Sequence, residues 1–266
     1  MINRHVTVPG AELHYEIRGD GPLLLVIGSP MAAAEFAPLA DAMASDRTVV
    51  TYDPRGHGVS AISGPDDDAT PDQRADDIVA ILDHLGATDA DVFGSSGGAV
   101  TGLALVSRHA GRVRTLVAHE PPLLELLADA EEQRRATDAI VDTFRTRGFG
   151  PAWHHFMVNA GFDLPSPGPD APAPPAPTGQ QLAEAARFFE HELRPTTRYL
   201  PDIPTLAASN VVVGIGEGSG HLVTYRTSVA LADLLGIKPV GFPGDHAGFL
   251  GAPAEFADRL RKVLDR

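Results

Sequence analysis

The sequence predicts an α/β protein built on a mostly parallel, doubly wound sheet. Strand-like and helix-like segments alternate along most of the chain, an order typical of parallel sheets with helices on both faces. Several strand-like segments are continuous apolar runs, as expected of strands that are covered on both sides. The length of 266 residues suits one large domain with an insertion and is ample for a buried core.

The first half of the chain supplies an opening hairpin and the first strand–helix pairs. His5–Val8 and Glu12–Arg18 alternate in character on either side of Pro9-Gly10, a pattern that predicts two antiparallel strands. The elements expected next are the strand Leu23–Ile27, a helix over Phe36–Ser45, the strand Thr48–Tyr52, a helix over Asp72–Leu85, a strand ending at Phe93 with a helix over Ala99–His109, and the strand Val113–Ala118.

The second half contains a long interruption. Residues 121–200 hold the helical segments Leu123–Arg147 and Gln180–Leu193, and between them an aromatic-rich piece and the proline-rich run Pro165–Thr178, which fits either a linker or part of a lid. The alternation returns with the strand Asn210–Ile215, the helix Thr224–Leu235, the strand Lys238–Phe242 and the helix Pro253–Leu264. We expect a core of residues 1–120 and 201–266, and a helical cap or lid of residues 121–200.

A candidate nucleophile lies in the turn between the strand ending at Phe93 and the helix that follows. Gly94 and Gly98 stand two residues on either side of Ser96, which matches the pattern G-x-S-x-G in its required strand–turn–helix context. Glycine tolerates the strain and close packing of such a turn. A turn without catalytic function is the alternative, because the pattern by itself is short. Residues elsewhere in the chain must therefore decide between a catalytic and a purely structural turn.

A serine hydroxyl needs a base, and the base needs a group that orients it. His246 is the best base, because it follows the last strand and precedes the final helix. Two carboxylates are candidates for the third group. Glu217 follows the penultimate strand, where Ser219 occupies the position expected for an acid, and Glu120 follows the strand Val113–Ala118. The carboxyl ends of these strands form the crevice in which doubly wound sheets bind ligands.

Two backbone N–H groups are expected to stabilise the negative oxygen of the transition state. Gly97 follows the nucleophile directly and supplies one of them. The loop after Leu23–Ile27 supplies the other, for which Ser29 is the candidate because Pro30 has no N–H.

Composition excludes several other classes of function. The formal charge of −14 opposes binding to nucleic acid or to anionic membranes. The absence of cysteine excludes disulfides and thiolate chemistry. No apolar run approaches eighteen residues, and the N-terminus has no signal-peptide core. We expect a cytoplasmic protein without metal or cofactor, and the sequence leaves a homodimer open.

Three motifs together resemble the α/β-hydrolase fold family across nearly the whole chain. They are Asp53-x-Arg55-Gly56-x-Gly58-x-Ser60, Gly94-x-Ser96-x-Gly98 and Pro243-Gly244-x-His246. Within this family, Gly94-Ser95-Ser96-Gly97 and His119-Glu120-x-Pro122 are similar to segments of the zearalenone lactonases, which open a resorcylic macrolactone. That resemblance implies a Ser96–His246–Glu120 triad with the Ser29 and Gly97 amides as oxyanion donors, and it implies that Glu217 is not the acid.

The expected activity is hydrolysis of a small-molecule ester or lactone through an acyl-enzyme. Two rivals remain: non-hydrolytic chemistry on a natural-product intermediate, such as cyclisation or carbon–carbon cleavage, and a catalytically silent ligand-binding protein. His57 is expected to be a loop residue near the crevice. The residues expected to line the substrate pocket are Pro30, Met31, Leu123, Trp153, Phe156 and Phe188, although helix packing explains the lid residues among them equally well.

Overall fold

The computed structural model describes residues 1–63, 67–164 and 176–265. Its centre is a nine-stranded sheet in the order β1-β2-β4-β3-β6-β7-β8-β9, with β5 paired to β2. The strands are β1 (Ile2–Val8), β2 (Ala11–Arg18), β3 (Leu23–Ile27), β4 (Thr48–Tyr52), β5 (Ala61–Ile62), β6 (Ala90–Ser95), β7 (Val113–His119), β8 (Val211–Gly216) and β9 (Val240–Phe242). Strands β3, β4 and β6–β9 pair in parallel, whereas β1 and β2 form the antiparallel edge. The predicted fold class is therefore confirmed.

Helices cover both faces of this sheet. On one face, α1 and α11 pack their apolar side chains against β3, β4 and β6, and on the other face α2, α3 and α9 form the larger core. The core helices are α1 (Ala37–Met43), α2 (Pro71–His84), α3 (Gly97–His109), α8 (Ile203–Ala207), α9 (Val223–Leu235), α10 (Gly248–Gly251) and α11 (Pro253–Leu264), with short turns of 3₁₀-helix at η1 (Ala33–Phe36) and η2 (Ala110–Arg112).

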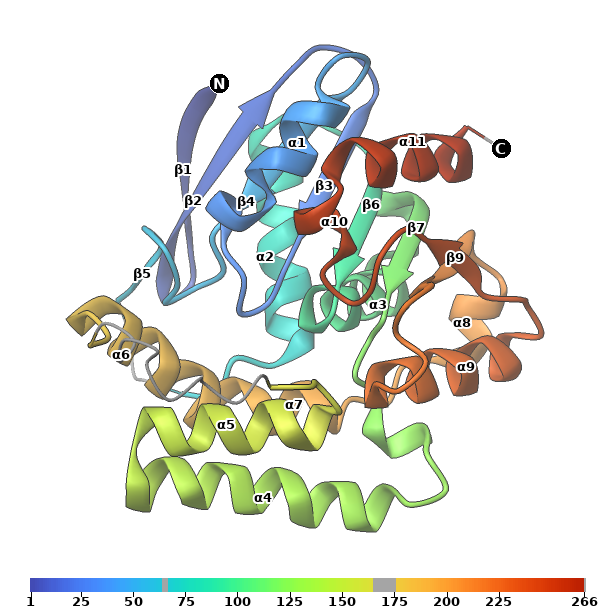
Figure 1. Ribbon diagram of the computed structural model, residues 1–266. Coiled ribbons are helices and arrows are strands. Elements are labelled where there is room, and N and C mark those ends of the chain that lie inside the picture. The colour runs from blue at the N-terminus through green and yellow to red at the C-terminus, as the bar shows by residue number, and fades with distance from the viewer. Residues whose placement is uncertain (64–66, 165–175, 266) are drawn as a thin grey trace.

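A layer of helices lies beyond the carboxyl ends of the parallel strands (Figure 1). This layer consists of η3 (Leu124–Leu126), α4 (Ala130–Arg147), α5 (Phe149–Ala160), α6 (Gly179–Arg187), η4 (Phe188–Glu192) and α7 (Leu193–Thr197). These helices share an apolar core of their own, which includes Ile140, Ala152 and Phe189. The layer thus closes over the edge of the sheet at which the candidate catalytic residues emerge.

The structure differs from the predicted elements mainly inside this layer. The single helix expected over Leu123–Arg147 is divided into η3 and α4, and the aromatic-rich piece is the helix α5. Of the proline-rich run Pro165–Thr178, residues 165–175 lie outside the described part of the chain. No helix among the described residues is both long enough and apolar enough to cross a membrane.

Candidate active site

The turn that carries Ser96 is strained and tightly packed. Ser96 has φ 55° and ψ −123°, a conformation that residues other than glycine rarely adopt. A Cβ atom at Gly94 would lie 2.5 Å from the carbonyl oxygen of Gly98, and one at Gly98 would lie 2.1 Å from that of Ile27. Both positions therefore require glycine, and their packing holds Ser96 between the end of β6 and the start of α3.

Glu120 lies directly against His246. Its carboxylate is fully buried, and Oε2 is 2.5 Å from Nδ1 of His246. The N–H of Gly216 donates to Oε1 at 2.8 Å, and the Thr224 hydroxyl donates to Oε2 at 2.9 Å. Burial raises the pKa of this carboxyl, but the hydrogen bond with His246 and the neighbouring polar groups outweigh it and bring the pKa to about 2. Glu120 is therefore ionised at neutral pH.

Glu217, the other candidate acid, lies at the protein surface. Its side chain is exposed, and its backbone N–H donates to the carbonyl of Phe242 at 3.0 Å. Ser219, at the position after the penultimate strand where an acid is expected, is fully buried. Residue spacing left both carboxylates open and the family resemblance implied Glu120, and it is Glu120 that the structure brings to the histidine.

Ser96 and His246 meet at one cavity of about 210 Å³. Among the described residues, hydrogen bonds to His246 come from the Glu120 side, and none joins its ring to the Ser96 hydroxyl. Catalytic hydrogen bonds are often long before substrate binds and tighten in the complex. Phe162 packs against the imidazole in a T-shaped arrangement, with ring centroids 5.8 Å apart, so an aromatic contact also restrains the His246 ring.

Ser29 and Gly97 also line this cavity. Gly97 is the first residue of α3, so its N–H has no partner within the helix and lies at the positive end of the helix dipole. A Cβ atom at Gly97 would be 2.5 Å from the Ser29 carbonyl oxygen, which shows that the two backbone segments are in direct contact. Ser29, Ser96 and Gly97 therefore lie together at the border of one cavity.

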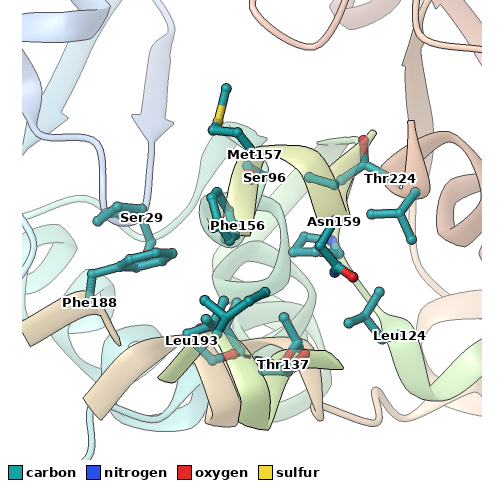
Figure 2. Close-up of a pocket in the computed structure, with 18 of the residues that line it drawn as sticks. Ser29, Ser96, Leu124, Thr137, Phe156, Met157, Asn159, Phe188, Leu193 and Thr224 are labelled. Atoms are coloured by element: carbon teal, nitrogen blue, oxygen red, sulfur yellow. Dashed lines mark hydrogen bonds between the residues drawn. The ribbon is translucent and has the colours of Figure 1, made fainter. Parts of the chain in front are cut away.

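The layer of helices beyond the strand ends, from here on called the cap, also contributes side chains to this cavity (Figure 2). Five of the six predicted pocket residues line the cavity: Pro30, Met31, Trp153, Phe156 and Phe188. The prediction for Leu123 is wrong, because this side chain is fully buried in the main core beneath the cap. Its neighbour Leu124 lines the cavity instead.

Among the residues that the structure describes, thirteen further ones that the sequence did not predict line the cavity. They are Pro122, Leu124, Thr137, Ile140, Met157, Asn159, Ala160, Phe162, Leu193, Thr196, Thr197, Val223 and Thr224. For α5 a signal was present, since Trp153, Phe156, Met157 and Ala160 follow the spacing of one helical face. For Thr224 no signal existed, because its importance comes from a hydrogen bond to Glu120, 104 residues away in the sequence.

His119 is a buried neutral histidine beneath the site. Burial lowers its pKa to about 4, although the negative charge of Glu120 opposes this. The ring lies among Phe93, Phe242, Phe249 and Phe256, with centroid separations of 5.5–6.5 Å. His119 therefore adds no positive charge that would compete with His246 for the carboxylate at neutral pH.

His57 does not line the 210 Å³ cavity. It is buried and hydrogen-bonded to Glu192 of the cap, and it borders a wider, more open groove of about 920 Å³. Met31, Trp153 and Phe188 line both spaces. Among the described residues no group of three or more histidine or acidic side chains is arranged to hold a metal ion.

Comparisons with known proteins fit this architecture. A sequence profile described as "alpha/beta hydrolase fold" matches residues 21–152. An uncharacterized hydrolase of Bacillus subtilis is 31% identical over 271 residues, which cover 99% of this chain and 96% of that protein. A zearalenone hydrolase of Cladophialophora bantiana is 34% identical over 121 residues, which cover 44% of this chain and 46% of that protein. The structure of a thermophilic esterase from Thermogutta terrifontis covers 100% of this chain and 98% of its own, with a TM-score of 0.71 at 18% identity. At that identity the likeness concerns the fold alone.

Proposed function

The chain belongs to the α/β-hydrolase fold family, and on this premise we propose that it hydrolyses a compact, uncharged carboxylic ester or lactone through an acyl-enzyme. One observation carries the proposal. A strained turn presents the Ser96 hydroxyl to a cavity that it shares with His246, and the ionised Glu120 lies 2.5 Å from the far nitrogen of that histidine.

The proposed mechanism follows from this geometry. The Nδ1–H of His246 donates to Glu120, so the neutral ring keeps Nε2 free to take the Ser96 proton as its oxygen attacks the carbonyl carbon. The N–H groups of Gly97 and Ser29 stabilise the oxyanion. The tetrahedral intermediate expels the alcohol, which takes the proton from Nε2. A water molecule, activated by the same nitrogen, then cleaves the acyl-enzyme and releases the acid.

The size and the lining of the cavity support a small, uncharged substrate. Ligand sites for drug-sized molecules usually measure about 300–1,000 Å³, so a cavity of about 210 Å³ fits a smaller molecule. His246 is the only histidine, acidic or basic residue among the described residues that line the cavity. A charged substrate would leave its charge without a partner there, at a high desolvation cost.

A macrolactone of the zearalenone type is the second candidate. The partial similarity to a zearalenone hydrolase and the segment His119-Glu120-x-Pro122 favour it. Such a ring would need more room than a cavity of about 210 Å³ offers. The wall formed by Met31, Trp153 and Phe188, which separates the cavity from the 920 Å³ groove, would have to move to admit it.

The test compares the wild type with Ser96→Ala and, as a matched control, Ser95→Ala. The substrates are p-nitrophenyl acetate, a small lactone and a resorcylic macrolactone. Removing the nucleophile should lower kcat by about 10⁴-fold or more, while the control should keep most of its activity because Ser95 does not line the cavity. A fluorophosphonate should label the wild type and fail to label Ser96→Ala.

The other outcomes separate the rival functions. Near-normal turnover by Ser96→Ala would refute the nucleophile assignment. Labelling of Ser96 without release of acid and alcohol from any ester would favour non-hydrolytic chemistry. Absence of labelling together with tight ligand binding would favour a binding protein.

A further inference from the structure

A buried ionic cluster joins the cap to the core outside the catalytic triad. Its centre is Glu192, the last residue of a turn of π-helix (η4), which is 1% exposed. From the loop after β4, His57 places its Nε2 2.8 Å from Oε1 of Glu192. Arg187 of α6 contacts the same oxygen at 3.5 Å, and Arg74 of α2 lies 3.8 Å from Oε2. The cap is thus fixed to two separate core elements through one carboxylate.

Charges of opposite sign are buried together in this cluster. Arg74 is fully buried, and the hydrogen bond with His57 helps to hold the pKa of Glu192 below its ordinary value although burial raises it. Opposite charges that are buried together become costly when one partner moves away. Arg74 also donates to the Thr196 hydroxyl at 2.6 Å, so the same arginine holds the cap at a second point one helical turn further on.

The residues on either side of Glu192 form part of the substrate cavity. Phe188, Leu193, Thr196 and Thr197 all line it, whereas Glu192 does not. The Glu192 carboxylate therefore contacts the core, while neighbouring side chains of the same segment line the cavity.

We propose that Glu192 is a positioning residue that sets the substrate-length selectivity of the site by holding the segment 188–197 against the core. The proposal rests on the proposed function. A rigid apolar wall can separate two substrates that differ by one methylene by about 10–200-fold in kcat/KM. It does so only while the wall keeps its position. When the contact between His57 and Glu192 is lost, the wall can yield, and longer acyl chains are accommodated at a smaller penalty.

The experiment uses His57 rather than Glu192 as its main variant, because Glu192→Gln would leave two buried arginines without their carboxylate and could prevent folding. His57→Leu removes the donor to Glu192, whereas His57→Gln retains one. Glu190→Gln is the control: Glu190 is on the same turn, but its partner is the exposed Arg145 at 3.5 Å. Two readouts are measured for each protein: kcat and KM for p-nitrophenyl esters from acetate to octanoate, and amide hydrogen exchange of residues 188–197.

The expected result is a change in selectivity without a change in chemistry. In His57→Leu, the ratio of kcat/KM between the best and the longest ester should fall by roughly tenfold, the size of a lost hydrogen bond to a charged group. Most of this change should appear in KM, and exchange over 188–197 should accelerate. The kcat for acetate should stay close to that of the wild type. His57→Gln should restore the length profile, and Glu190→Gln should retain it.

Two results would overturn the proposal. One is an unchanged length profile in a folded His57→Leu protein, whatever its exchange rate, since the cluster would then serve stability alone. The other is an equal change in Glu190→Gln, which would show that the effect is not specific to the cluster. If the wild type cleaves none of the esters and Ser96 is not labelled by fluorophosphonate, the proposed function itself fails and the selectivity role fails with it. Accelerated amide exchange over 188–197 in His57→Leu would then show only that the contact between His57 and Glu192 stabilises the structure.

Discussion

Replacing Glu120 by glutamine would exchange one buried acceptor for a donor while keeping the shape of the side chain. The carboxylate accepts from the Gly216 N–H through Oε1, and from His246 and the Thr224 hydroxyl through Oε2. A glutamine has only one oxygen for these donors. The Gly216 N–H belongs to the sheet and cannot rotate away, so the amide oxygen should face it. The amide NH₂ would then face Nδ1 of His246.

This arrangement predicts a large loss of activity. An NH₂ group beside Nδ1 favours the tautomer that carries its proton on Nε2, the nitrogen that must accept the proton from Ser96. In serine triads a wrong tautomer costs about 10⁴-fold in kcat, or about 5 kcal/mol in the barrier. Binding should change much less, because Glu120 does not line the cavity. We therefore expect the loss to appear in kcat, with KM nearly constant.

The assay is steady-state hydrolysis of p-nitrophenyl acetate by the wild type, Glu120→Gln and the matched control Glu217→Gln. Circular dichroism should first establish that each variant is folded. The control removes an exposed carboxylate from the neighbouring strand end and should keep kcat within about threefold, as expected of a surface substitution. If folded Glu120→Gln retained kcat within tenfold of the wild type, or if Glu217→Gln lost the activity instead, the reasoning about the acid would be wrong.

Two further predictions concern stability. Because the folded-state pKa of Glu120 is about 2, below the ordinary value of 4.5, its ionised form stabilises the fold above pH 4.5. This contribution, about 3 kcal/mol at 1.36 kcal/mol per pKa unit, should be lost as the pH falls from about 4.5 to about 2. Urea unfolding at several pH values should show the advantage of the wild type over Glu120→Gln shrinking across that range, and a constant difference would contradict the assignment. Gly98→Ala should lower the free energy of unfolding by about 3 kcal/mol or more, because its Cβ would lie 2.1 Å from the Ile27 carbonyl oxygen. Gly111→Ala, where nothing lies within 4 Å of a Cβ, is the control, and an equal cost at both sites would refute the packing argument.

The sheet was largely predictable from the sequence because its signals are local. The runs Leu23–Ile27 and Thr48–Tyr52 match β3 and β4 to the residue, since continuous apolar strands between turns have few other interpretations. The cap was harder. Its helix α5 is apolar on the face toward the cavity, but Gly150 and Pro151 near its start weaken the helical pattern.

The candidate site was predictable where it depends on turns, and unpredictable where it depends on distant contacts. Ser96 and His246 could be named because a nucleophile turn and the loop after the last strand have recognisable local sequences. The choice between Glu120 and Glu217 could not be made from spacing, because both follow parallel strands. Only the packed sheet places one carboxylate beside the histidine and leaves the other in solvent.

The sequence by itself determined the fold class, the strained serine turn and the set of titratable groups at the carboxyl edge of the sheet. These follow from apolar periodicity and from glycine at positions where a side chain would collide with backbone. The tertiary structure alone decided which carboxylate is ionised against His246, that Leu123 belongs to the core, and that Glu192 fixes the cap from behind the cavity. Each of these depends on atoms that are far apart in the chain and come together only when the two layers pack, so no local pattern records them.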